Sequence, residues 1–182
     1  MQLTLFAAYT TIIVGFIWAR YKYFSIETNS SRRGSYFYDP IVALHIISTF
    51  YEFTQPNNPN LLICSISISC YLLGSILFIL SVRNTNSLDF AFSDKVSNLI
   101  TTGTYALVRH PLYVSYALVW IGSSILFNSL LLWITLAYLL AFYIISAIKE
   151  ERVILNSEYS REYENYRQDV GMFLPRIKEW KS

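Results

Sequence analysis

The chain has 182 residues, of which 54% are hydrophobic, 17% aromatic and only 14% charged. A water-soluble domain carries about a quarter charged residues, so this composition excludes a soluble globular protein and predicts an all-α integral membrane protein. The net charge of +2 and the lack of a basic run indicate no nucleic-acid partner. The expected partner is the lipid bilayer. Cys64 and Cys70 lie six residues apart in an apolar segment, a spacing typical of inert buried thiols rather than of a metal site.

Five apolar segments follow one another along the chain, at residues 1–19, 37–54, 61–82, 111–127 and 129–148. A membrane-spanning helix needs about 20 apolar residues, with roughly 17 as the lower limit, so we expect about five transmembrane helices. The first segment has no basic region before it and ends at Arg20 rather than at a cleavage site, which favours a retained span over a signal peptide. The second contains His45 and Glu52. We expect a structural or lumen-facing role for His45 rather than a catalytic one.

The placement of charge predicts how the spans are oriented. With five crossings and the N-terminus outside, the inner segments are 20–36, 83–110 and 149–182, and they contain all 14 Lys and Arg residues. The outer connections, residues 55–60 and the turn at Asn128, contain none. Because positive residues are retained on the cytosolic side, the C-terminus and the functional groups near it are expected on the cytosolic face.

The last part of the chain predicts an amphipathic helix on the inner membrane surface. Apolar residues recur there every three or four positions, which is the helical period, and Pro175 is expected to end the helix. These apolar residues are Leu155, Tyr159, Tyr163, Tyr166 and Val170. We therefore interpret residues 1–182 as one membrane domain with a cytosolic C-terminal segment at 149–182.

Two short motifs are expected to meet at the cytosolic end of the last two spans. Only residues 127–129 join these spans, and Asn and Ser suit a helix stop and the next N-cap. The two helices then run antiparallel over roughly 25–30 Å, which brings residues 109–113 and 149–151 together. Pro111 suits the first position of a helix, and the residue before a proline avoids the helical conformation. His110 is therefore expected in an extended stretch that faces the space between the cytosolic ends of these two helices.

The charges of these motifs match a zwitterionic ligand. A helix N-terminus with Arg109 favours an anionic group, whereas Glu150 and Glu151 favour an ammonium group or a pair of ribose hydroxyls. The amino-acid end of S-adenosylmethionine has both features. The alternatives are that Arg109 is an interfacial flank residue and that the glutamates are the solvated start of the surface helix.

Five motifs in order along the chain resemble the isoprenylcysteine carboxyl methyltransferase family, within the wider phospholipid methyltransferase-like membrane methyltransferases. The resemblance extends from about residue 97 to 177 and rests on Gly103-Thr104-Tyr105, Arg109-His110-Pro111-Leu112-Tyr113, Glu150-Glu151, the Tyr163/Tyr166 pair and Leu174-Pro175. It implies a metal-independent methyltransferase that uses S-adenosylmethionine and takes a lipid-like or prenylated acceptor entering sideways from the bilayer.

The resemblance also implies which residues form the site. Catalytic roles fall on Arg109, His110, Tyr113 and Glu150. The residues that it implies for cofactor binding are Ser97, Asn98, Leu99, Ile100, Gly103, Tyr105, His110, Pro111, Tyr113, Glu150 and Glu151.

The sequence departs from this family at positions that bear on the acceptor. Ser146 stands where the eukaryotic enzymes have an arginine that binds the substrate carboxylate. Phe90 stands at about the position where those enzymes have a glutamine upstream of the cofactor loop. Both a carboxylate acceptor, as in isoprenylcysteine O-methylation, and an amine, as in phospholipid N-methylation, therefore stay open. An NADPH-dependent membrane reductase, which has a similar Arg-His-Pro-x-Tyr segment, and a non-catalytic membrane subunit are alternatives of other classes.

Overall fold

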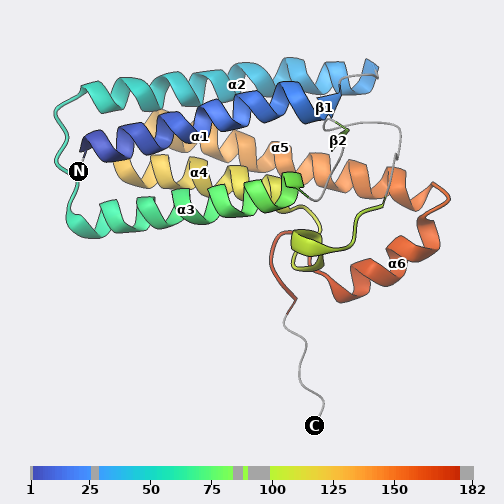
Figure 1. The fold of residues 1–182 in the computed structure, drawn as a ribbon. Coiled ribbons are helices and arrows are strands. Elements are labelled where there is room, and N and C mark those ends of the chain that lie inside the picture. The colour runs from blue at the N-terminus through green and yellow to red at the C-terminus, as the bar shows by residue number, and fades with distance from the viewer. Residues whose placement is uncertain (1, 26–28, 84–87, 90–98, 177–182) are drawn as a thin grey trace, which may run out of the picture.

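The computed structural model describes residues 2–25, 29–83, 88–89 and 99–176 (Figure 1). The helices are α1 (Gln2–Tyr23), α2 (Asn29–Thr54), α3 (Leu61–Arg83), the 3-10 turn η1 (Gly103–Ala106), α4 (Pro111–Phe127), α5 (Leu130–Leu155) and α6 (Ser160–Asp169). A two-residue strand β1 (Phe24–Ser25) pairs in parallel with a two-residue strand β2 (Leu88–Asp89). The predicted all-α class is confirmed, because every longer element in the described part of the chain is helical.

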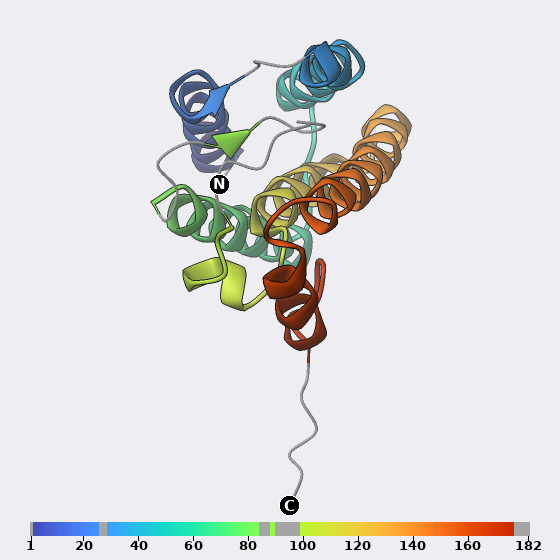
Figure 2. The same cartoon turned by 90° about the vertical axis from the view of Figure 1, so that its right-hand side faces the viewer.

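The five long helices form a bundle of two layers. In the end-on view, α3, α4 and α5 lie in one layer and α1 and α2 lie in a second layer beside it (Figure 2). The short helix α6 lies outside the bundle at one end, next to the C-terminal end of α5 (Figure 1). That end holds the first turn of α4 and the last turns of α5.

Three described helices are long and apolar enough to cross a membrane, namely α1, α3 and α5. The apolar helix α4 has 17 residues, and α2 is not among the three. The structure therefore supports a membrane protein, while the count of five crossings and their orientation stay predictions. Helix α2 begins at Asn29 rather than at Phe37, where its apolar segment starts. Polar residues extend the helix because its hydrogen-bond ladder satisfies their backbone groups regardless of what surrounds the side chains.

The ring of His45 joins α2 to the other layer of the bundle. Its Nδ1 lies 2.7 Å from the Thr135 hydroxyl of α5, and its Nε2 lies 2.9 Å from the Ser123 hydroxyl of α4. His45 is fully buried, with the edge of its ring against Trp120. In this buried position the two hydroxyls satisfy both ring nitrogens, which fits the structural role expected for His45.

Small residues allow α3 and α4 to pack closely. A Cβ atom added to Gly74 would lie 2.9 Å from the Ser115 carbonyl oxygen, and one added to Gly122 would lie 2.9 Å from the Tyr71 ring. Such close approach gives dispersion contacts that hold helices together in lipid, where no hydrophobic driving force acts between them. Along α3, Cys64 is buried and Cys70 is half-buried, so full burial was predicted correctly only for Cys64.

The connection between α4 and α5 is the tight turn that was predicted. Asn128 ends α4 in the left-handed conformation, with φ of 50°, and Ser129 precedes the first residue of α5. The Asn128 side-chain oxygen accepts a hydrogen bond of 3.1 Å from Trp133 Nε1. Because the turn is so short, α4 and α5 are antiparallel neighbours, and the start of one lies beside the end of the other.

The prediction of one amphipathic helix that follows Glu151 and ends at Pro175 is wrong in its boundaries. Helix α5 continues to Leu155, the chain then turns, and α6 covers only Ser160–Asp169. The turn forms because Asn156 donates from its side chain to the Arg152 carbonyl oxygen and Ser157 donates to that of Ile154. These local hydrogen bonds replace the next turn of helix.

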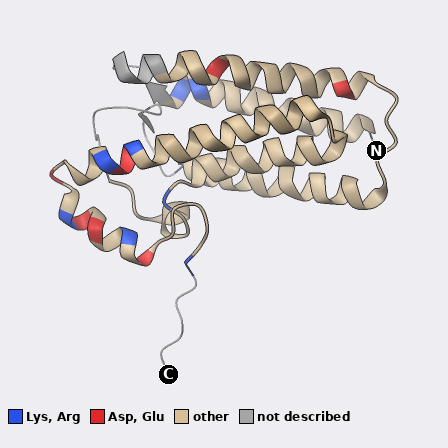
Figure 3. Ribbon diagram, turned by 180° about the vertical axis from the view of Figure 1, so that it is seen from behind, with Lys and Arg blue, Asp and Glu red and all other residues tan. Residues whose placement is uncertain are grey.

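Charged side chains are divided unevenly between the two ends of the bundle. Figure 3 shows that the described Lys and Arg residues gather at the end where α6 lies, and that the end with the N-terminus shows none among the residues drawn in colour. The described Lys and Arg residues, which occur in alternate connections along the sequence, thus lie at one end of the bundle.

Candidate functional site

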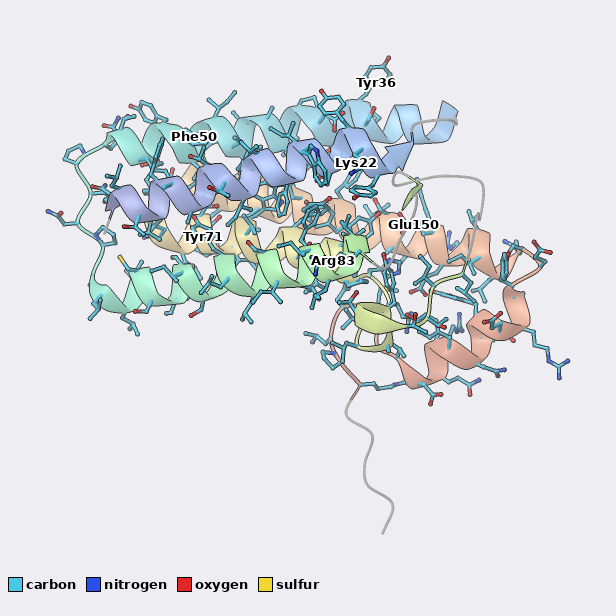
Figure 4. All side chains as sticks on the ribbon, viewed as in Figure 1. Lys22, Tyr36, Phe50, Tyr71, Arg83 and Glu150 are labelled. Atoms are coloured by element: carbon cyan, nitrogen blue, oxygen red, sulfur yellow. The ribbon has the colours of Figure 1, made fainter. Side chains whose placement is uncertain are left out.

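The two sequence motifs meet at the α6 end of the bundle. Arg109 lies just before α4 and Glu151 lies near the end of α5, and Arg109 Nε donates to Glu151 Oε1 at 2.9 Å across 42 residues of sequence. His110 Nε2 donates to the same oxygen at 3.2 Å. In the side-chain view, Glu150 lies at the same end as Lys22 and Arg83, away from Phe50 and Tyr71 in the other half (Figure 4). The predicted juxtaposition of the motifs is therefore present in the fold.

Local stereochemistry orients His110 as the sequence predicted. Pro111 is the first residue of α4, and His110 precedes it with φ of −124° and ψ of 63°, outside the helical region. The His110 ring stacks on Tyr113, with ring centroids 5.7 Å apart and planes 16° apart. This arrangement leaves the imidazole edge facing the carboxylates of α5.

Glu150 and Glu151 have different surroundings. Glu150 accepts a hydrogen bond from the Tyr113 phenol, and its Oε2 lies 3.5 Å from His110 Nδ1. Its side chain is 27% exposed, whereas that of Glu151 is 9% exposed, close to that of Arg109 at 11%. His110 thus bridges one half-exposed carboxylate and one buried carboxylate.

Electrostatics favour the charged forms of this cluster. Burial alone lowers the pKa of His110, but hydrogen bonds and charges from Glu150 and Glu151 outweigh it and raise the pKa above the ordinary 6.5. Burial raises the pKa of Glu151, but hydrogen bonds from His110 and Arg109 and the Arg109 charge together lower it to about 2. At neutral pH, Glu151 is therefore an anion that faces the Arg109 guanidinium and the His110 ring.

A strap formed by residues 170–172 holds the first motif from its other side. The Arg109 and His110 backbone N–H groups donate to the carbonyl oxygens of Gly171 at 2.9 Å and Met172 at 3.1 Å. The Arg109 guanidinium also donates to the Val170 carbonyl oxygen. A Cβ atom added to Gly171 would lie 2.0 Å from the Leu174 carbonyl oxygen, so this position accommodates only glycine in the observed conformation.

Helix α6 fastens the loop that leads into the site. Tyr166 donates from its phenol to the Tyr105 carbonyl oxygen at 2.5 Å. Burial raises the pKa of Tyr105 well above its ordinary value, and burial raises that of Tyr166 to about 12. Both phenols are therefore neutral near neutral pH. Gly103 begins η1 with φ of 65°, a conformation that favours glycine.

A cavity of about 430 Å³ opens beside the charged cluster and extends between α1, α2, α4 and α5. This size lies within the ~300–1,000 Å³ typical of small-molecule sites. Its charged lining residues are Arg20, Asp39, Arg109, His110 and Glu150, and most of the remaining wall is aliphatic or aromatic. The cavity therefore offers a polar end and a long apolar wall to the same ligand.

Some of the residues implied by the family resemblance line the cavity, and others do not. Gly103 and Glu151 do not line it, and Ser97 and Asn98 lie outside the described residues. The predicted site residues that line it are Leu99, Ile100, Tyr105, Arg109, His110, Pro111, Tyr113 and Glu150. Glu151 is thus placed to hold Arg109 and His110, while Glu150 faces the cavity.

Sequence reasoning missed the wall contributed by the first two helices. Arg20 from α1 and Tyr38 and Asp39 from α2 line the cavity, as do Tyr116 of α4 and Tyr143 of α5. Tyr38 and Tyr143 are linked through their hydroxyls at 3.2 Å, and Trp120 donates to Tyr143 at 2.9 Å. The sequence offered one signal for this wall, namely the charges of Arg20 and Asp39 near the ends of two apolar segments. The signal was missed because no spacing rule links residues on different helices.

Comparisons with known proteins give the chemical context of this site. The model of the family described as phospholipid methyltransferase matches residues 62–162. The chain is 38% identical over 77 residues to a methanethiol S-methyltransferase from Crocosphaera subtropica, covering 42% of this chain and 29% of that protein. It is 32% identical over 79 residues to the protein-S-isoprenylcysteine O-methyltransferase of Schizosaccharomyces pombe, covering 43% of this chain and 34% of that protein.

The name of a third relative refers to metal resistance rather than to methyl transfer. The nickel-cobalt-cadmium resistance protein NccN of Alcaligenes xylosoxydans xylosoxydans is 31% identical over 88 residues, which cover 48% of this chain and 41% of that protein. In all three cases the chain spans less than half the length of the relative that it matches.

Proposed function

The chain belongs to the phospholipid methyltransferase family, and on that premise we propose that it transfers a methyl group from S-adenosylmethionine to a lipid-like acceptor within the cavity. One observation carries this proposal. His110, Pro111, Tyr113 and Glu150, which the resemblance assigns to the cofactor, lie at the polar end of a cavity whose remaining wall is mostly apolar. Such a cavity suits a polar cofactor and an amphiphilic acceptor side by side.

The residues at the polar end have chemistry that fits S-adenosylmethionine. Glu150, half-exposed and facing the cavity, suits the cofactor's ammonium group or ribose hydroxyls. The ring of Tyr105, which lines the cavity, suits an adenine ring or a sulfonium cation. When bound, the cofactor supplies an electrophilic methyl group on a positively charged sulfur. Glu151 does not line the cavity, and its role is to hold Arg109 and His110 in place.

The contacts of the His110 ring favour a carboxylate acceptor over an amine. Both ring nitrogens lie against carboxylates and the pKa of the ring is raised, so His110 is not a ready base for removing a proton from an ammonium group. A carboxylate acceptor is already ionised near neutral pH and needs no base. Its oxygen forms the new O–CH3 bond as the S–CH3 bond of the sulfonium breaks, and the chain contributes alignment and exclusion of water.

Calorimetry of the detergent-purified protein with S-adenosylmethionine, S-adenosylhomocysteine and NADPH tests this function. We expect both adenosyl compounds to bind, with affinity reduced in Glu150→Ala and His110→Ala. Glu164→Gln, which changes an exposed carboxylate on α6, is the matched control and is expected to bind normally. Binding of NADPH alone would identify a reductase, and binding of none of the three would favour a non-catalytic subunit. Transfer of labelled methyl groups to prenylcysteine analogues and to phosphatidylethanolamine then identifies the acceptor.

We also propose that the N-terminus lies outside and that the cavity mouth lies on the cytosolic face, with residues 97–177 as the cofactor-binding region. The support is the gathering of Lys and Arg at the α6 end (Figure 3). A cysteine introduced at Asn60, between α2 and α3, is expected to react with an impermeant maleimide in intact cells. One introduced at Ser157, between α5 and α6, is expected to react only after lysis. The reverse pattern would invert the topology.

A further inference from the structure

The cavity has a similar depth along three of the helices that form it. Its lining residues fall within 13–21 on α1, 38–46 on α2 and 111–120 on α4. At 1.5 Å of rise per residue, each of these stretches is about 12–14 Å long. The charged cluster lies at one end of them. In the described part of the chain, the lining residues at the other end, which form the floor of the cavity, are Ile13, Ile46 and Trp120.

Trp120 is held in the floor from several sides. Its side chain is almost completely buried, at 1% exposure, although it lines the cavity. Its Nε1 donates to the Tyr143 hydroxyl at 2.9 Å. The rings of His45 and Phe16 meet it in T-shaped contacts, with centroids 5.1 and 6.1 Å away. The indole is therefore a fixed stop rather than a side chain that a ligand easily displaces.

The interior behind Trp120 does not suit an apolar chain. The two nitrogens of His45 lie against the hydroxyls of Thr135 and Ser123, and all three of these polar side chains are buried. A chain that moved the indole aside would separate Tyr143 from its donor and place methylene groups against these polar groups. Buried polar groups that lose their partners are costly, so the floor is firm in energy as well as in shape.

The distance from the charged cluster to the floor limits the length of a bound chain. Tyr113, whose phenol donates to Glu150, and Trp120 are seven residues apart on α4, which is about 10 Å. With C–C bonds of about 1.5 Å in a zigzag, an extended alkyl chain of roughly eight carbons spans this distance. The wall along it is mostly apolar, with Phe16 and Ile17 on α1 and Val42 on α2.

We propose that Trp120 is a specificity-determining residue that limits the apolar part of the methyl acceptor to roughly eight carbons beyond the reactive atom. This inference rests on the proposed function and specifies its acceptor as an amphiphile with a short apolar chain. A longer chain has to leave the cavity between helices, and binding measurements on chains of different length distinguish the two cases.

Two series of probes test the limit by calorimetry in one detergent. S-alkyl-N-acetylcysteines have a carboxylate head and primary alkylamines have an amine head, each with a butyl, octyl or dodecyl chain. The measured quantity is the ratio of dodecyl to octyl affinity in each protein. Partition into detergent depends on the probe and not on the variant, so it cancels when the ratios of two variants are compared.

Trp120→Ala is expected to raise the dodecyl-to-octyl ratio about tenfold or more over that of the wild-type protein, in at least one series. A tenfold change is roughly the contribution of two buried methylene groups. Equal loss of affinity at every chain length would show that Trp120 only supports the fold, and would overturn the inference. An unchanged ratio in both series, or no binding of either series by the wild-type protein, would also overturn it.

Two further variants keep the test independent of folding. Ile46→Phe leaves Trp120 in place and fills the floor from α2, so it is expected to lower the octyl-to-butyl ratio about tenfold. This result is decisive if Trp120→Ala does not fold, and an unchanged ratio then overturns the inference. Trp133→Ala is the matched control, because Trp133 on α5 bonds to Asn128 and does not line the cavity. Its ratios are expected to equal those of the wild-type protein.

The chain-length series is measured without cofactor, which separates this inference from the proposed function. Failure of the wild-type protein to bind S-adenosylmethionine overturns the proposed function, and calorimetry detects that failure independently of Trp120. A limit that shifts in Trp120→Ala while S-adenosylmethionine binds with unchanged affinity supports both.

Discussion

His110 and His45, the two histidines of the chain, lie among the same helices in opposite chemical surroundings. The His110 ring lies between the carboxylates of Glu150 and Glu151, whereas both nitrogens of His45 lie against hydroxyl groups. Both rings are buried and both are fully partnered. Carboxylates stabilise a charged ring that can organise a ligand site, while hydroxyls satisfy a neutral ring that fastens one helix to two others.

Burial of a histidine therefore does not by itself indicate function. The His110 cluster leaves Glu150 facing a cavity, so part of its charge is available to a ligand. The partners of His45 face only the ring itself and backbone carbonyl oxygens, since Thr135 also bonds to Leu131 and Ser123 to Trp120. We therefore expect changes at the two regions to separate ligand binding from stability.

The largest effect is expected from Glu151→Gln. The change leaves the part-buried Arg109 guanidinium without its anionic partner, which costs about 2–3 kcal/mol for a hydrogen bond to a charged group. It also weakens cofactor binding because Arg109 and His110 lose their orientation. Denaturant unfolding in detergent micelles measures the loss. Glu164→Gln on the exposed face of α6 is the control, and a loss below about 1 kcal/mol would contradict the buried pairing.

Glu150→Gln is expected to separate binding from stability. Glu150 faces the cavity and is more exposed than Glu151, so its loss should reduce affinity for S-adenosylmethionine roughly tenfold or more and change unfolding little. Calorimetry and denaturant unfolding on the same preparation give both values. If Glu150→Gln and Glu151→Gln behave alike, the proposed division of roles between the two carboxylates is wrong.

His45→Ala is expected to show the opposite pattern. Loss of the ring removes the hydrogen bonds that join α2 to α4 and α5, at a cost of about 2 kcal/mol, and leaves the affinity for S-adenosylmethionine unchanged. The unfolding midpoint and calorimetry of the folded fraction measure the two quantities. A loss of affinity comparable to that of Glu150→Gln would show that the two regions are coupled.

The smallest effect is expected from mild changes of pH. The pKa of His110 is raised above 6.5 in the fold, so its stabilising contribution is complete below about 6.5 and declines as the pH rises through the folded pKa. The pKa of Glu151 is lowered from 4.5 to about 2, so its contribution is present above 4.5 and declines as the pH falls towards 2. The unfolding midpoint should therefore decrease when the pH falls below 4.5 and when it rises through the folded pKa of His110. His110→Gln should abolish the decrease on the alkaline side.

The site was largely predictable where local rules act. Pro111 places His110 just outside the helix, and Asn128 and Ser129 make the turn tight, so the approach of Arg109 to Glu151 follows from helix geometry. The boundaries of α6 were not predictable in this way. The apolar period continues through Leu155 and Tyr159, and only the side-chain hydrogen bonds of Asn156 and Ser157 break the helix.

The sequence by itself determined that this is an apolar helical protein, that its positive charge lies in alternate connections, and that two motifs lie at the ends of adjacent helices. These are consequences of composition, period and turn chemistry, which act over a few residues. Only the tertiary structure decided that Glu150 faces the cavity while Glu151 holds Arg109 and His110, and that Arg20 and Asp39 complete the wall. Those assignments depend on the packing of separate helices, where the rotation of each helix about its axis is set by side-chain contacts that no local pattern records.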